Sequence, residues 1–323
     1  MNRRDLLTLA AALPAAALWA PRARAAAYPD HPITLVVPLA PGSGTDSIGR
    51  LVASGLGAAL GTTIVPENKV GANGAIGCSF VARAAPDGYT LLMGGTTTHA
   101  GNPNLMKSIT YNPVTDFTPI AQLGVYPYAL LVSGKSEFRS LQQVIDAAKA
   151  RPGALSFAYA NALGQLSGEL LKRRAGIDLN PVAYRGSPQA ITDIIGGRVT
   201  MMFVDMPPAA AQIEAGTLRP LAVTTEARTA FLPDVPTLAE ANLGGPRVEA
   251  WTGLFAPART PKPIVDAIYA RLTVVLSRPE LMAQATALGF EPKPTPPEVF
   301  GRRVADEVAL WATLTRQAGM EPQ

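Results

Sequence analysis

The chain has 323 residues, of which 48% are hydrophobic and 16% charged, a balance typical of a globular protein with an ample core. The single cysteine, Cys78, excludes an internal disulfide, and one thiol with two histidines cannot form a Cys/His zinc site. The net charge of +4 does not come from a basic stripe interleaved with aromatic residues, so nucleic-acid binding is not expected.

The first 25 residues have the features of a secretory signal. Arg3 and Arg4 precede an apolar stretch at residues 6–19, and Ala23-Arg24-Ala25 fits a small-x-small cleavage site. As a helix this stretch would be only about 21 Å long, too short for a bilayer core. We therefore expect cleavage near Ala25 and a periplasmic protein with no membrane anchor in this leader.

Most of the positive charge belongs to this leader. It carries four arginines and one aspartate, so the remaining chain has a net charge of +1. The pair Arg3-Arg4 permits twin-arginine export, but paired arginines also begin ordinary secretory leaders. Both export routes therefore stay open.

From Tyr28 onward, short β-branched runs alternate with helical patterns. Ile33–Val37 predicts a buried strand, and after a Gly/Pro/Ser loop a helical pattern begins near Thr45. Further strands are predicted at residues 62–65 and 90–93, with a helix between them. This alternation predicts an α/β unit around a parallel sheet.

The alternation resumes after Asn112-Pro113. Ser140 with Gln143 predicts the start of one helix, and Ser187 before Pro188 predicts the start of another. About the last 60 residues are predicted to be nearly all helix. Two α/β units in an exported chain indicate two lobes with a cleft, and ligands in open parallel sheets bind beyond the carboxyl ends of the strands. The strands predicted in this second unit are residues 129–132, 155–158, 200–204 and 221–224.

The loop at residues 41–46 is the most informative local feature. Gly42 and Gly44 let backbone amides face a guest, and the helix that follows adds its positive end, so the loop favours an anion. An ordinary tight turn is the alternative. A dinucleotide fingerprint is disfavoured, because Ser47 replaces its third glycine and Asp46 would lie beside a pyrophosphate.

Catalysis is not expected, and neither is a metal or another cofactor. The sequence has no Gly-x-Ser-x-Gly elbow, and only His31 and His99 are candidate histidine bases. His31 is interpreted as solvated. His99 follows a predicted strand and is a candidate to line the cleft. Cys78 is interpreted as a small core residue.

Other loops at strand ends supply hydroxyls, amides and one acid. Asn161 and Gln165 lie in one such loop, Arg185 is a candidate partner for a carboxylate, and Asp205 follows a predicted strand. Asp205 either accepts a hydrogen bond from a ligand ammonium or hydroxyl or caps the next helix. Both interpretations stay open.

Several segments, taken in order, carry a resemblance to a known family. They resemble the Bug family, the periplasmic solute-binding proteins of tripartite tricarboxylate transporters, nearly from end to end. The matching segments are Val36-Val37-Pro38 with Asp46, Pro86-Asp87-Gly88-Tyr89-Thr90-Leu91, Asp116-Phe117-Thr118-Pro119-Ile120, Tyr184-Arg185-Gly186-Ser187, Leu232-Pro233-Asp234-Val235-Pro236-Thr237 and Trp251-Thr252-Gly253-Leu254.

The resemblance implies a type II periplasmic binding protein fold, an α/β fold with two doubly wound lobes, a ligand cleft and two crossover strands. After the signal peptide at residues 1–25, the first domain would comprise residues 26–125 and 252–323. Residues 126–251 would form the second domain. The crossovers are expected near residues 123–128 and 248–253.

The resemblance also implies the function: capture of a small carboxylate, such as an organic acid or acidic amino acid, for tripartite tricarboxylate-type transport. The partners would be integral membrane subunits of the transporter, and a monomer is expected. An extracytoplasmic sensor using the same cleft is the alternative. The implied binding residues are Gly42, Ser43, Gly44, Thr45 and Asp46, faced by Thr97, Thr98, Ala160, Asn161, Ala162, Tyr184, Gly186 and Asp205.

Overall fold

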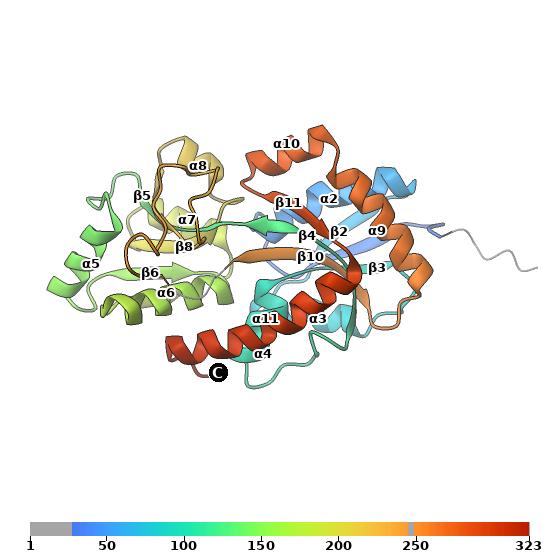
Figure 1. Cartoon of the computed structure of the whole chain (residues 1–323), viewed down its shortest axis with the longest axis horizontal. Coiled ribbons are helices and arrows are strands. Elements are labelled where there is room, and N and C mark those ends of the chain that lie inside the picture. The colour runs from blue at the N-terminus through green and yellow to red at the C-terminus, as the bar shows by residue number, and fades with distance from the viewer. Residues whose placement is uncertain (1–27, 245–248, 323) are drawn as a thin grey trace, which may run out of the picture.

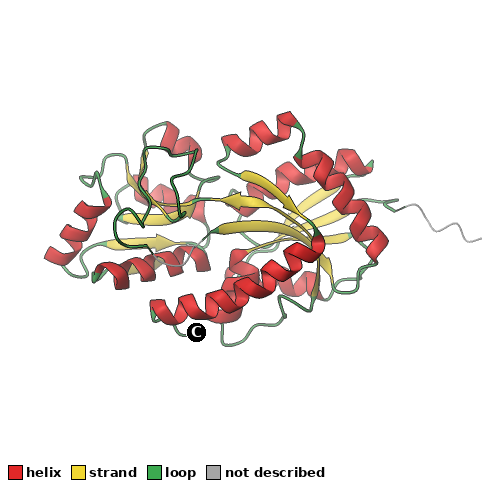
Figure 2. Cartoon of the chain, viewed as in Figure 1, coloured by secondary structure: helices red, strands yellow, loops and turns green. Residues whose placement is uncertain are grey.

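Two β-sheets lie at the centres of two lobes (Figure 1). The computed structural model describes residues 28–244 and 249–322, so the predicted leader lies outside the described residues. The larger sheet has the strand order β11-β4-β10-β3-β1-β2, and the smaller has the order β7-β6-β8-β5-β9. Helices pack around both sheets (Figure 2).

The parallel part of the larger sheet comes from the first part of the chain. β1 (Ile33–Val37) pairs with β2 (Ile64–Asn68) on one side and with β3 (Thr90–Gly95) on the other. α2 (Gly44–Leu60) connects β1 to β2, and α3 (Ala75–Ala82) connects β2 to β3. The strand predicted from the β-branched run is confirmed with the same bounds, since this run is almost wholly buried.

Three antiparallel strands complete the larger sheet. β10 (Ala250–Pro257) lies between β3 and β4 (Phe117–Tyr126) and is antiparallel to both. β11 (Glu291–Thr295) pairs with β4 at the edge. The prediction of a nearly all-helical C-terminal part was therefore wrong here. Pro292 and Pro294 hide the strand from sequence patterns, yet an edge strand tolerates proline.

The smaller sheet combines a parallel and an antiparallel part. Its central β8 is parallel to β6 and antiparallel to β5. The predicted strands correspond to β5, β6, β8 and β9, with bounds shifted by up to three residues. The pattern missed β7 because its residues are exposed or half-buried. The strands are β5 (Tyr128–Ser133), β6 (Ser156–Tyr159), β7 (Asn180–Ala183), β8 (Met201–Asp205) and β9 (Leu218–Val223).

Of the two predicted helix starts, one is confirmed and one is shifted by a single residue. Ser140 caps α5, because its Oγ accepts a hydrogen bond from the Gln143 N–H at 3.3 Å. Gly186, and not the predicted Ser187, is the N-cap of α7. The remaining helical segments are η2 (Ala72–Gly74), η3 (Thr96–Gly101), α4 (Asn102–Leu105), α5 (Leu141–Ala150), α6 (Ala162–Ala175), α7 (Ser187–Ile195), α8 (Ala210–Glu214), α9 (Lys262–Leu276), α10 (Pro279–Ala287) and α11 (Pro297–Ala318).

The chain passes between the sheets near the centre of the molecule. β4 ends at Tyr126 and β5 begins at Tyr128, so the first crossover runs through Pro127. On the return path β9 ends at Val223 and β10 begins at Ala250. Residue 248, the start of the second expected crossover, lies outside the described residues.

α11 contacts both lobes. It packs against β4 of the larger sheet and, farther along, against α6 of the smaller lobe (Figure 1). Trp311 is 1% exposed, and its ring lies beside Gly101 of η3. Its ring and Ala162 of α6 both flank Gly101, so the last helix helps to fix how the lobes sit together.

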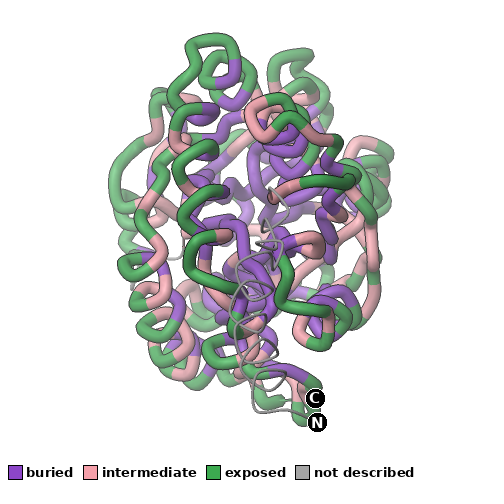
Figure 3. The backbone as a smooth tube through the Cα atoms, turned by 90° about the vertical axis from the view of Figure 1, so that its right-hand side faces the viewer, coloured by how far each residue is buried: buried purple, intermediate pink, exposed green. Residues whose placement is uncertain are grey.

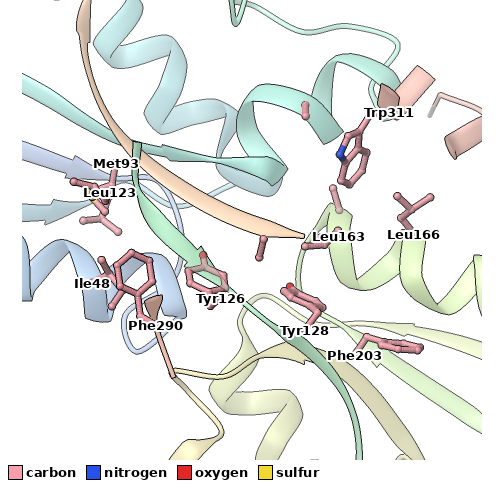
Figure 4. Close-up of a cluster of buried hydrophobic side chains, with 14 of the residues drawn as sticks. Ile48, Met93, Leu123, Tyr126, Tyr128, Leu163, Leu166, Phe203, Phe290 and Trp311 are labelled. Carbon is pink, nitrogen blue, oxygen red and sulfur yellow. The ribbon is translucent and has the colours of Figure 1, made fainter. Parts of the chain in front are cut away.

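A buried apolar cluster continues from one sheet into the other. Figure 4 shows Tyr126 and Tyr128 at the crossover, with Phe290 near the first and Leu163 near the second. The tube in Figure 3 is buried along its centre and exposed along its outer turns. Cys78 is fully buried, as predicted, and burial raises the pKa of its thiol to about 12. In the part of the chain that the structure describes, no helix combines the length and apolarity of a membrane span.

Candidate ligand-binding site

A cavity of about 30 Å³ lies where the two lobes meet. It is bordered by the carboxyl ends of β1, β3, β6 and β8, the position expected for a ligand in open parallel sheets. Residues from both lobes and both chain crossings contribute. The lining residues are Pro38, Leu39, Ser43, Thr45, Met93, Gly95, Thr96, Thr97, Thr98, Tyr126, Tyr128, Asn161, Leu163, Asp205, Ala250 and Trp251.

Asp205 is the acid of this cavity. It is the last residue of β8, lies opposite Tyr128 in the sheet, and is only 4% exposed. Its Oδ1 has no hydrogen-bond partner among the described residues. Burial raises the pKa of the carboxyl to about 6, although the N–H groups of Asp205 and Gly44 favour the charged form.

The start of α2 faces this carboxylate across the cleft. A Cβ built on Gly44 would lie 1.8 Å from Asp205 Oδ2, so the two residues are in direct contact. The positive end of a helix attracts a carboxylate. The sequence predicted a ligand carboxylate at this helix end, whereas in this structure the Asp205 side chain lies there.

The other predicted loop amides are used within the loop. The Gly42 N–H donates to Asp46 Oδ2 at 2.9 Å, and the Ser43 N–H donates to the Ala40 carbonyl at 3.1 Å. The Asp46 N–H donates to Ser43 Oγ at 3.4 Å, which caps α2. The idea of a rim of amides all facing a ligand is therefore corrected. Ser43 and Thr45 are the residues of this loop that line the cavity.

Asp46 positions the loop and does not line the cavity. Its Oδ2 also accepts from Arg50 Nε at 3.0 Å, and its Oδ1 accepts from Asn68 Nδ2 at 2.8 Å. Burial opposes the charged form, but the hydrogen bonds from Arg50, Gly42 and Asn68 outweigh it and lower the pKa of the Asp46 carboxyl. The structure therefore gives Asp46 a supporting role, and its direct contact with a ligand stays a prediction.

Thr97 and Thr98 line the cavity, but His99 does not. Thr98 Oγ1 accepts a hydrogen bond from the Gly95 N–H at 3.0 Å and lies 2.9 Å from His99 Nδ1. The His99 ring is fully buried and stacks on Phe255, with ring centroids 4.0 Å apart. Burial lowers the pKa of His99 to about 3. The prediction that His99 could line the cleft was wrong, because its ring packs into the aromatic core.

Of the loop after β6, only Asn161 lines the cavity. Its Oδ1 accepts from the Tyr128 hydroxyl and from the Gly164 N–H, both at 2.9 Å, so it caps α6 and is tied to the crossover. Ala162 is fully buried and packs near Gly101. Ala160 is half-buried and does not border the cavity.

Tyr184 and Gly186 also lie away from the cavity wall. The Tyr184 hydroxyl donates to Asp193 Oδ2 at 2.8 Å. A Cβ on Gly186 would lie 2.7 Å from the Ala40 Cβ, and one on Gly42 would lie 3.2 Å from Pro188 Cγ. Gly42 and Gly186 thus mark a contact between the lobes, and they leave room for it because they lack side chains.

The sequence did not single out the aromatic part of the site. Tyr126 and Tyr128 flank the crossover, and Trp251 lies on β10 opposite Val125. All three are buried and line the cavity. In the sequence they look like core residues. Their position at the predicted crossovers was the signal that could have found them.

The side chains around the cavity are suited to binding a ligand through hydrogen bonds more than to catalysing a reaction. Its polar side chains are hydroxyls, one amide, the indole N–H of Trp251 and the carboxyl of Asp205, and no lysine, arginine or histidine is among the lining residues of the described chain. Within the same described residues, no group of three histidine, cysteine, aspartate or glutamate side chains could hold a metal ion.

Comparison with known proteins places these features in context. Residues 48–320 match the family described as tripartite tricarboxylate transporter family receptor. Protein BugT of Bordetella pertussis (strain Tohama I) is 35% identical over 325 residues, which cover 99% of each chain.

Solved structures give the same result. An R. palustris protein solved with adipate is 34% identical with a TM-score of 0.88, covering 92% of this chain and 100% of its own. MatC from Rhodopseudomonas palustris with bound malate is 33% identical with a TM-score of 0.84, covering 89% and 99%. The resemblance predicted from the sequence and the two-lobed periplasmic binding protein fold are confirmed.

Proposed function

Because the chain belongs to the tripartite tricarboxylate transporter receptor family, whose members are periplasmic binding proteins and not enzymes, we propose that it captures a small carboxylate in the cavity between its lobes. The observation that carries this proposal is that two relatives of the same fold hold adipate and malate. The hydroxyls around the cavity supply donors for such an anion.

The proposed mechanism is closure of two domains on the ligand. The first domain would comprise residues 26–125 and 252–323, and the second residues 126–251, with bending near Pro127. Ser43, Thr45, Thr97 and Thr98 would hold the ligand from the first domain and Asn161 from the second. The ligand would shift the population toward the closed form, and no bond would be made or broken.

The proposed setting is the periplasm, after removal of residues 1–25, with the protein acting as a monomer. The closed form would present the ligand to integral membrane subunits of a tripartite tricarboxylate transporter. Deleting the gene should then abolish uptake of the identified acid by cells that hold these subunits. Unchanged uptake would contradict the transport role without contradicting ligand binding.

The first test is a thermal-shift screen of the mature chain against small mono-, di- and tricarboxylates, followed by calorimetry. We expect at least one acid to raise the melting temperature and to decrease the radius of gyration in X-ray scattering. Thr97→Val should weaken the binding of that acid, because the substitution removes a hydroxyl from the cavity wall. Thr273→Val, at a half-buried position of α9 outside the cavity, is the matched control. An absence of any stabilising acid would contradict the proposed function.

A further inference from the structure

Asp205 presents a buried acceptor to the cavity. Resting on the proposed function, we propose that Asp205 makes the cleft prefer acids that also carry a hydroxyl or ammonium donor, such as α-hydroxy and α-amino acids, over plain dicarboxylates of the same length. The donor would pair with Oδ1 of Asp205. The sequence left open whether Asp205 meets a ligand or caps a helix, and α8 begins only at Ala210, after the N-cap Ala209.

The first support is the unpaired oxygen. Asp205 is only 4% exposed. Its Oδ1 has no hydrogen-bond partner among the described residues, while its Oδ2 contacts Gly44. A buried carboxylate oxygen without a partner destabilises the state that contains it. A ligand that supplies a donor removes this cost, whereas a ligand without one leaves it.

The second support is the absence of a compensating cation. The groups that face Asp205 are Gly44 from α2, Tyr126 from β4 and Tyr128 from β5, with Asn161 nearby. The Tyr128 hydroxyl already donates to Asn161. No lysine, arginine or histidine lines the described cavity. The second carboxylate of a plain dicarboxylate would therefore meet the negative charge of Asp205 unless a proton is taken up.

The test uses three acids with one carbon skeleton: succinate, malate and aspartate, which carry a hydrogen, a hydroxyl or an ammonium at the same carbon. Adipate and α-aminoadipate form a longer pair. Affinities are measured by calorimetry at pH 7.5 for wild type, Asp205→Asn and Asp266→Asn. Asp266 is exposed on α9, where it pairs with Lys262, and its substitution gives the same change in net charge away from the cavity.

We expect wild type to prefer the donor-bearing acid of at least one series by about ten- to hundredfold, the range that a hydrogen bond to a charged group supplies. Asp205→Asn should reduce that preference at least about tenfold. The variant should bind the amino acid more weakly and the plain dicarboxylate more tightly than wild type. Asp266→Asn should keep the preference of wild type.

A pH series on wild type keeps the test independent of whether the variant folds. The plain dicarboxylate should bind more tightly as the pH falls from 7.5 to 5, because a proton on Asp205 then supplies the missing donor. The amino acid should lose its advantage over the same range.

The outcomes separate the two proposals. If no acid of either series binds, the proposed function and this inference both fail for these ligand lengths. If acids bind but wild type shows no preference for the donor, or Asp205→Asn keeps the same preference, only the role of Asp205 is overturned.

Discussion

Gly44 and Asp205 touch across the cleft: a methyl group on the Gly44 Cα would lie 1.8 Å from Oδ2 of the Asp205 carboxylate. One residue begins the first long helix of one lobe, and the other ends a central strand of the second lobe. The contact joins the lobes beside the cavity, so changes at either residue should affect closure before they affect folding.

Gly44→Ala should hinder closure. The added methyl cannot coexist with the Asp205 carboxylate in its present position, so we expect an increased radius of gyration with ligand present and an affinity reduced about tenfold or more. X-ray scattering and calorimetry measure both quantities. Gly301→Ala is the control, because its methyl would lie at an ordinary 3.4 Å from Pro119 Cγ. If Gly44→Ala closes and binds like wild type, the contact does not limit closure.

Asp46→Asn should loosen the loop before α2. The carboxylate holds Gly42, Arg50 and Asn68, so its loss should reduce the free energy of unfolding by about 1–3 kcal/mol at pH 7. The pKa of Asp46 is lowered in the folded protein, so this stabilisation is present above the unfolded value and is lost as the pH falls through the folded value. Urea unfolding at pH 7 and pH 3 should show a smaller difference between wild type and variant at pH 3. An equal difference at both pH values would contradict the role of the charge.

Asp205→Asn should stabilise the ligand-free protein at neutral pH. Burial raises the pKa of Asp205 to about 6, so the stabilising protonated form is fully populated below the unfolded pKa and is lost as the pH rises through the folded value. Urea unfolding from pH 4 to pH 8 should show wild type losing about 1–3 kcal/mol relative to the variant as the pH rises. Parallel curves would indicate that Asp205 is solvated when no ligand is bound.

His99 should make the protein sensitive to acid. Its pKa is lowered to about 3 by burial, so below about pH 6.5 the unfolded chain takes up a proton that the folded chain does not. The free energy of unfolding should fall as the pH decreases through this range. In His99→Leu, which loses the contact with Thr98, overall stability should be lower but the dependence on pH shallower. An unchanged slope would argue against a neutral buried His99.

Much of the fold could be predicted because its central strands are apolar runs. Ile33–Val37 is buried almost throughout, so its β-branched residues gave the strand with its observed bounds. β11 could not be found in this way, because its Pro-Lys-Pro sequence and its mostly exposed residues lack the pattern of a buried strand. It is a strand because it pairs with β4 at the edge of the sheet. Its extended conformation therefore depends on a tertiary contact and not on the strand propensity of its own residues.

Several of the residues predicted to bind a ligand lie in the wall of the cavity, but the way they come together could not be predicted. Ser43, Thr45, Asn161 and Asp205 line the cavity, because strand ends and helix starts can be located from sequence. The contact between Asp205 and Gly44 could not be predicted, since it joins two lobes. Ala162 was misplaced because a residue one position from Asn161 turns toward the core once α6 begins.

The last helix limits how the molecule can swing open. Trp311 and Ala162 both flank Gly101, and they belong to different lobes. Separating the lobes at Gly44 must either break this packing or pivot on it. α11 would then set the axis about which the lobes rotate. The direction of opening would thus depend on a helix that has no residue in the cavity wall.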